Sequence, residues 1–144
     1  NMIVRKPILL LTGDFLYMQH GRDQKTYKID TKSNINQIYT RKSRKIETIL
    51  YSRSTPSVKI KKIMHTLDIN KIIQCGSALK FCLLSEGVAD LYIRHDPCYE
   101  WDTAAGVCIL QNAGGSVVDE NGQALKYNTK DDLLSPVFFA SGKP

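Results

Sequence analysis

The stretch Glu100-Trp101-Asp102-Thr103-Ala104-Ala105-Gly106 decides how this chain is organised, because it marks the point where a loop turns into a helix. Aspartate commonly caps a helix by accepting a backbone N–H from its first turn. The stretch therefore predicts a helix over residues 103–112, with Asp102 as its cap and Gly114-Gly115 at its end. The small side chains after Thr103 let that helix start pack closely against a ligand or another backbone. Such a corner also offers free N–H groups and the positive end of a helix dipole, which favour anions.

On both sides of this stretch, within residues 46–144, predicted strands and helices alternate. Runs of apolar residues predict strands at residues 46–51, 71–74, 89–94, 116–119 and 137–140. Ser54-Thr55-Pro56 opens a first helix, and a second is expected over residues 78–86. This alternation predicts an α/β fold of layered sheet and helices.

The first part of the chain has a weaker pattern. Ile8-Leu9-Leu10-Leu11 and Phe15-Leu16-Tyr17-Met18 are typical of two short strands. Residues 19–45 are polar and basic with poor periodicity, so we expect them to be irregular. The sequence therefore divides into a poorly patterned segment, residues 1–45, and an α/β subdomain, residues 46–144.

The chain is basic, with a formal net charge of +6 and an isoelectric point of about 9.2. Such a balance favours anionic partners, namely nucleic acid, acidic lipid or a phosphorylated small molecule. One basic cluster, Lys59, Lys61 and Lys62, is however explained as the polar side of the first helix. The apolar positions of that helix follow helical spacing: Ile60, Ile63, Met64 and Leu67. No aromatic residues interleave the basic clusters as a base-stacking surface would need. A basic nucleic-acid-binding module is therefore the less favoured alternative.

The cysteines and the hydropathy indicate the cellular setting. The four cysteines, Cys75, Cys82, Cys98 and Cys108, have no metal-site spacing, and Cys82 and Cys108 lie in apolar stretches. We expect free thiols in a reducing cytosol. No apolar run approaches the roughly 20 residues that span a bilayer. These features predict a cytoplasmic protein.

Four residues are candidates for binding a charged ligand. A second oxygen of Asp102 can bind a hard cation such as Mg²⁺, although an ordinary helix cap is the commoner role for such a residue and the favoured one from the sequence alone. Ser77 and Lys80 bring a hydroxyl, free N–H groups and an ammonium to one helix start, which suits a phosphate. Arg94 ends a strand, where ligand crevices of α/β sheets lie, and arginine binds phosphate in bidentate fashion. Each feature alone is common in proteins without such sites.

Together these pieces resemble one family. The order and spacing of four segments match over residues 46–141: residues 76–82, 86–94, 100–106 and 113–115. They are similar to the carboxy-terminal half of the CysQ-type 3'(2'),5'-bisphosphate nucleotidases, in the inositol monophosphatase superfamily. The continuation Leu79-Lys80-Phe81-Cys82 and Arg94 favour the nucleotidase branch over the inositol phosphatases. The resemblance implies the sugar-phosphatase fold.

The resemblance also implies a reaction. Family members remove the 3'-phosphate of adenosine 3',5'-bisphosphate with the help of Mg²⁺ and give AMP, a step of sulfur assimilation and nucleotide recycling. By this resemblance Asp102 is a metal ligand that also touches substrate. Ser77, Lys80 and Arg94 are implied to bind the nucleotide or its phosphate, and no catalytic residue is identified in this half.

The chain departs from the family pattern in its metal ligands. The family carries a glutamate and an Asp-Pro-Ile/Leu-Asp-Gly-Thr motif in its amino-terminal half, and neither occurs among the 14 acidic residues here. Asp96-Pro97-Cys98-Tyr99 lacks the second aspartate and the glycine, and Thr55 replaces a family histidine. One carboxylate cannot hold two Mg²⁺ ions. We therefore expect a fragment whose amino-terminal domain is missing.

Several readings of the chain remain open at this point. It is inactive alone, as a remnant or as one subunit of a split enzyme, or it works with a complementing amino-terminal chain or as a homodimer. An inositol monophosphatase-type activity is a further alternative, as is peripheral attachment to the inner membrane face.

Overall fold

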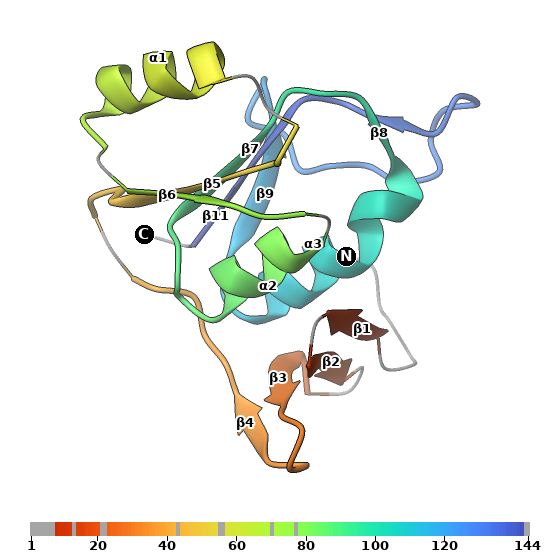
Figure 1. The fold of residues 1–144 in the computed structure, drawn as a ribbon. Coiled ribbons are helices and arrows are strands. Elements are labelled where there is room, and N and C mark those ends of the chain that lie inside the picture. The colour runs from red at the N-terminus through yellow and green to blue at the C-terminus, as the bar shows by residue number, and fades with distance from the viewer. Residues whose placement is uncertain are drawn as a thin grey trace.

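The computed structural model describes residues 8–12, 14–20, 23–42, 44–54, 57–69, 71–76 and 78–142. Figure 1 shows helices and sheets in alternating layers, with α1 on one side of a five-stranded sheet and α2 and α3 on the other. A four-stranded sheet lies beyond α2 and α3. The predicted layered α/β fold is therefore confirmed.

The five-stranded sheet has the order β6-β5-β7-β11-β9. Its strands lie within two residues of the predicted bounds: β5 (Thr48–Tyr51), β6 (Lys71–Gln74), β7 (Leu91–Arg94), β9 (Ser116–Asp119) and β11 (Phe138–Ser141). β5 pairs in parallel with β6 and β7, while β11 runs antiparallel to β7 and β9. The carboxyl ends of β5, β6 and β7 therefore meet at one edge of the sheet.

Helices cover both faces of this sheet: α1 (Ser57–Leu67), α2 (Leu79–Ser85) and α3 (Glu100–Asn112). Because side chains alternate along a strand, Ile49 faces α1 while Leu50 faces the other side. Ile49 packs in one core with Ile60 of α1, and Leu50 packs in another with Phe81 of α2 and Leu110 of α3. These cores fix α2 and α3 against the sheet.

The amphipathic pattern of the first helix is confirmed. Ile60 is buried and Ile63 and Met64 are partly buried, while the lysines of α1 are exposed. Leu67 was expected on the apolar side, but it is exposed in the last turn of the helix. The lysines of α1 thus form the solvent-exposed side of the helix.

The second sheet overturns the expectation that residues 19–45 are irregular. It is antiparallel and has the order β1-β2-β3-β4, with strands at Ile8–Thr12, Phe15–His20, Lys25–Ile29 and Ile35–Gln37. The sequence pattern failed because inward positions of β3 are polar yet partnered. The Thr26 hydroxyl donates to the Ile109 carbonyl at 2.7 Å, and Lys28 Nζ lies 2.6 Å from Glu86 Oε2. Polar groups with such partners can be buried.

The start of α3 also differs from the prediction. A two-stranded pairing of β8 (Cys98–Tyr99) with β10 (Leu134–Ser135) runs directly into the helix, which begins at Glu100. The N-cap is Tyr99, so Asp102 is the third helical residue and not the cap. The helix ends as predicted, with Gly114 in the left-handed region at a φ of +102°.

The four cysteines are free and buried. Burial raises the pKa of each thiol, that of Cys82 to about 12, so they remain protonated at neutral pH. Among the described residues, no helix has the length and apolar character needed to cross a membrane.

Candidate active site

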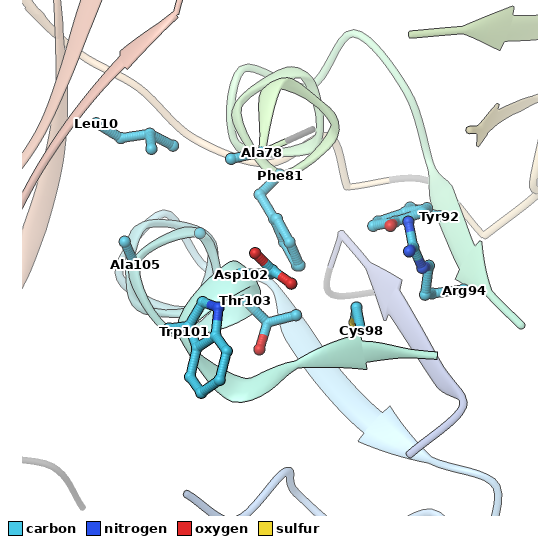
Figure 2. A pocket seen from close by; sticks show the side chains of 11 residues that line it. Leu10, Ala78, Phe81, Tyr92, Arg94, Cys98, Trp101, Asp102, Thr103 and Ala105 are labelled. Carbon is cyan, nitrogen blue, oxygen red and sulfur yellow. The ribbon is translucent and has the colours of Figure 1, made fainter. Parts of the chain in front are cut away.

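A cavity of about 460 Å³ opens between the first turns of α3, the start of α2 and the end of β7. In Figure 2 the Asp102 carboxylate lies near the middle of the labelled side chains, with Arg94 and Tyr92 on one side and Trp101 on the other. Leu10 of β1 also lines the cavity, so both sheets contribute to its wall. The volume is within the usual range for a small-molecule site.

Close packing of α2 against α3 shapes the wall of this cavity. A Cβ atom on Gly106 would lie only 2.7 Å from Phe81 Cγ, so the glycine is needed for the two helices to approach. The small residues in the first turns of α3 were expected to pack against a ligand or another backbone, but at Gly106 the close contact is with the side chain of Phe81. Thr103, expected to offer a hydroxyl near Asp102, is instead buried, and its Oγ1 donates to the Glu100 carbonyl at 3.1 Å.

Asp102 is fixed by the helix start yet open to the cavity. Its Oδ2 accepts the backbone N–H of Tyr99 at 3.0 Å, as an acidic third residue of a helix often does. Its Oδ1 has no hydrogen-bond partner in the described part of the chain, and the residue is exposed. One carboxylate oxygen is thus available to a cation or a ligand.

Arg94 lies on the opposite wall with its guanidinium held in place. Nε donates to the Asp96 carbonyl at 3.0 Å and Nη2 to the Pro97 carbonyl at 3.3 Å. Burial alone would lower the pKa of Arg94, but the Tyr92 hydroxyl, together with Cys98 and Asp96, outweighs burial and the pKa is raised. No ion pair links Arg94 to Asp102 among the described residues, so the charge of the guanidinium remains available to an anion.

Lys80 is not part of the cavity wall. It is fully buried, and its Nζ donates to the Cys75 carbonyl at 3.1 Å. Its ammonium lies 5.0 Å from the centre of the Tyr92 ring, and Tyr92 lines the cavity whereas Lys80 does not. Burial lowers the pKa of Lys80, and the nearby Arg94 adds to this effect. The structure brings Arg94 and Asp102 together but leaves Lys80 behind them, so its binding role stays a prediction.

Ser77 lies outside the described residues, and so do Thr55 and Pro56. The predicted hydroxyl at the start of α2 is therefore also left as a prediction.

Sequence reasoning assigned no role to an aromatic pair at the cavity. The rings of Tyr99 and Trp101 stack with centroids 4.4 Å apart and an interplanar angle of 9°. Both residues are exposed, and Trp101 lines the cavity. Trp101 belongs to the stretch that predicted the helix, but sequence carries no signal that its ring would stay in solvent.

The donor set does not complete a magnesium site. Asp102 is the single acidic residue lining the cavity, and no group of three or more His, Cys, Asp or Glu side chains able to hold a metal occurs in the described residues. Mg²⁺ prefers six oxygens in octahedral geometry and usually needs one or two carboxylates besides phosphate and water. The described residues thus supply one ligand and do not fit two ions.

Comparison with known proteins connects this geometry to one group of enzymes. The sequence profile of the Inositol monophosphatase family matches residues 11–142. The 3'(2'),5'-bisphosphate nucleotidase CysQ of Escherichia coli K12 is 39% identical over 93 residues, covering 65% of this chain and 38% of that protein. A protein of Rhizobium leguminosarum, named for its place in the pss 5' region, is 46% identical over 79 residues, or 51% of this chain and 83% of that protein.

A solved structure agrees with the sequence matches. The crystal structure of CysQ from Bacteroides thetaiotaomicron superimposes with a TM-score of 0.74 and 29% identity, covering 90% of this chain and 54% of that one. The chain thus spans about half of the solved CysQ and less than half of the Escherichia coli protein.

Proposed function

Because the chain belongs to the inositol monophosphatase family, we propose that it contributes to hydrolysis of a phosphomonoester, the 3'-phosphate of adenosine 3',5'-bisphosphate, with AMP as product. The observation that carries the proposal is one cavity of about 460 Å³ lined by both Asp102 and Arg94. A cavity with a fixed cation on one wall and an open carboxylate on another suits an anionic substrate that arrives with a metal ion.

The choice of substrate rests on the relatives. The matching proteins from several bacteria are named 3'(2'),5'-bisphosphate nucleotidase CysQ, and the sequence similarity to them is higher than to the solved inositol monophosphatases. Because the chain covers only 38% of the Escherichia coli protein, the nucleotide substrate is part of the proposal. An inositol phosphate is the second candidate, since the family profile is named for that activity.

The residues of the cavity have separate tasks in this proposal. Arg94, held by two carbonyls, offers its remaining N–H groups to the phosphate without first ordering a flexible side chain. Asp102 offers Oδ1 as one ligand of Mg²⁺ while Oδ2 stays on the helix start. Bound Mg²⁺ would neutralise phosphate charge and acidify a water molecule. The remaining oxygen ligands of such an ion would have to come from phosphate, water and a complementing amino-terminal chain.

Phosphate release tests this function. We expect the chain alone, with adenosine 3',5'-bisphosphate and Mg²⁺, to release phosphate slowly or not at all because its carboxylates are too few. Addition of a complementing chain, such as the part of Escherichia coli CysQ outside the match, should raise the rate, and Asp102→Asn should abolish that gain. Asp131→Asn, an exposed aspartate that does not line the cavity, is the matched control.

Two outcomes would change the proposal. Rapid turnover by the chain alone that Asp102→Asn abolishes would show that no complementing chain is needed. Faster hydrolysis of inositol 1-phosphate than of the nucleotide would favour the second candidate.

A further inference from the structure

Glu100 is an acidic residue that does not line the cavity, although it belongs to the same helical turn as Asp102. It is the first residue of α3 and is 7% exposed, whereas Asp102, two residues later, is exposed and lines the cavity. Successive residues of an α-helix are about 100° apart around the axis, so the two carboxylates project from opposite sides of the first turn. No step of the proposed function uses Glu100.

Glu100 is tied at two points to the loop between β9 and β10, residues 120–133. Its Oε2 accepts the backbone N–H of Asn128, and its own backbone N–H donates to the Leu133 carbonyl at 2.9 Å. The second carboxylate oxygen, Oε1, is buried and has no hydrogen-bond partner among the described residues. Burying a carboxylate with so few donors is unfavourable, so stability alone does not explain an acidic residue at this position.

The two loop residues that Glu100 contacts have left-handed backbone conformations. Asn128 has a φ of +54° and Leu133 a φ of +52°. Asparagine tolerates this region, but leucine rarely adopts it because its Cβ atom crowds the backbone there. Such residues persist where the surrounding structure holds them, and they are frequent at functional sites. Glu100 supplies a hydrogen bond to both.

Further contacts join the same part of the chain to α3. The Thr103 hydroxyl lies 3.2 Å from the Tyr127 hydroxyl and 3.4 Å from the Ser135 hydroxyl. Strand β10, which follows the loop, pairs with β8 and places Leu134 opposite Tyr99. Tyr127 also packs against the core of α2, α3 and the five-stranded sheet. The loop therefore supports the first turn of α3 from the side that carries Glu100.

The direction of the Asp102 side chain depends on this first turn. Its Oδ2 accepts the Tyr99 N–H within the turn, and no side chain of the described residues forms a hydrogen bond to it. Figure 2 shows its carboxylate with Arg94 on one side and Trp101 on the other. A shift of the turn would move the open oxygen of Asp102 relative to the Arg94 guanidinium, and a displacement of about 1 Å in a site can reduce activity strongly.

From these contacts we infer that Glu100 is a positioning residue: its bonds to Asn128 and Leu133 hold the first turn of α3, and this turn directs Asp102 into the cavity. The role deepens the proposed function and rests on it, because the proposed function is what requires Asp102 at the cavity. Since the bond to Asn128 needs an acceptor oxygen at one distance, the length of the side chain matters more than its charge.

Substitutions of Glu100 separate length from charge. Glu100→Gln keeps the acceptor oxygen in place, Glu100→Asp keeps the charge but is one methylene too short, and Glu100→Ala removes both. By NMR, we expect the aspartate and alanine variants to exchange the Tyr99 amide hydrogen, which bonds to Asp102, at least about tenfold faster than the parent chain. Exchange in Glu100→Gln should stay within about twofold of the parent value. Glu120→Ala, an exposed glutamate of the same loop, is the matched control.

Affinity for adenosine 3',5'-bisphosphate in the presence of Mg²⁺ is the second measurement. The fluorescence of Trp101, the single tryptophan, reports binding at the cavity that it lines. The dissociation constant should rise about five- to tenfold in the aspartate and alanine variants and stay unchanged in Glu100→Gln and Glu120→Ala. A role limited to stability would leave the affinity of the folded chain unchanged. If Glu100→Ala fails to fold, the aspartate and glutamine variants still give the comparison.

Each result decides for or against this role. Unchanged Tyr99 exchange in Glu100→Asp, or a loss in Glu100→Gln as large as in Glu100→Ala, overturns the positioning role and favours a charge effect on the helix dipole. Faster exchange with unchanged affinity also overturns it, because binding would then not need a fixed Asp102. If the parent chain does not bind the nucleotide, the proposed function fails, whereas the exchange rates still decide whether Glu100 holds Asp102 in place.

Discussion

At the scale of the residue, Asp102 has two roles that substitutions can separate. Asp102→Ala removes the acceptor of the Tyr99 N–H and a negative charge from the first turn of α3. We expect it to lower the free energy of unfolding by about 0.5–1 kcal/mol. Asp102→Asn keeps an acceptor oxygen and should cost less, while still removing the charge that a cation needs. Urea denaturation measures both, and a larger loss in the asparagine variant would contradict this assignment.

Gly106 tests the contact between α2 and α3. Gly106→Ala should gain up to about 1 kcal/mol of helix propensity, but its Cβ would press on Phe81. Overpacking of a tight core costs about 1–3 kcal/mol, so we expect net destabilisation of about 1 kcal/mol. The double variant with Phe81→Leu should recover part of this loss. Thermal unfolding measures both effects. If Gly106→Ala destabilises the chain equally with and without Phe81→Leu, the added methyl group does not clash with Phe81.

The residues of the site differ in how well their positions could be predicted from the sequence. Asp102 and Arg94 were expected near one another because a strand end and a helix start fix their backbones, and both line the same cavity. Lys80 was expected with them, but its long side chain turns to the Cys75 carbonyl. A residue's position on a helix does not determine where a flexible four-carbon side chain puts its charge.

At the scale of the element, Asp90 joins the segment after β4 to the five-stranded sheet. Its carboxylate accepts Arg41 Nε at 2.8 Å and the backbone N–H groups of Glu47 and Thr48, each at 2.9 Å. Burial alone would raise the pKa of Asp90, but these donors together lower it. Breaking these hydrogen bonds should free the segment that leads into β5.

This carboxylate predicts a specific pH dependence. Because the pKa of Asp90 is lower in the folded than in the unfolded chain, its contribution is present above the usual aspartate value of about 4 and is lost as pH falls through the folded-state pKa. Asp90→Asn should lower the free energy of unfolding by about 1–3 kcal/mol at neutral pH. The variant should also lose less of its remaining stability than the parent chain as the pH falls. Urea denaturation between pH 7 and pH 2 measures this, with Asp131→Asn as control. An unchanged acid slope in Asp90→Asn would contradict the prediction.

The strands of the first sheet show where sequence patterns fail. β1 and β2 were predicted because their apolar runs are continuous, whereas β3 mixes lysines and threonine with apolar residues in no regular alternation. Its inward groups are satisfied by Ile109 and Glu86, which lie more than 50 residues away in sequence. A partner so distant leaves no local signal, so tertiary contacts decide this element.

At the scale of the whole molecule, the predicted division near residue 45 can be tested by cooperativity. α3 packs against both sheets through Val107 and Ile109, which belong to different cores. The Tyr17 hydroxyl on β2 also donates to Glu86 next to α2. Burial, together with this carboxylate, raises the pKa of Tyr17 strongly, so the phenol stays protonated. Connected cores of this kind favour one cooperative transition for a chain of 144 residues.

We therefore expect both sheets to unfold together. Trp101 is the single tryptophan, so its fluorescence reports α3, while far-ultraviolet circular dichroism reports all elements. Their urea curves should coincide, and Tyr17→Phe should shift both midpoints equally, by about 1 kcal/mol of stability. An earlier transition in circular dichroism, moved alone by Tyr17→Phe, would mean that the first sheet unfolds by itself and that the sequence division marks a true domain boundary.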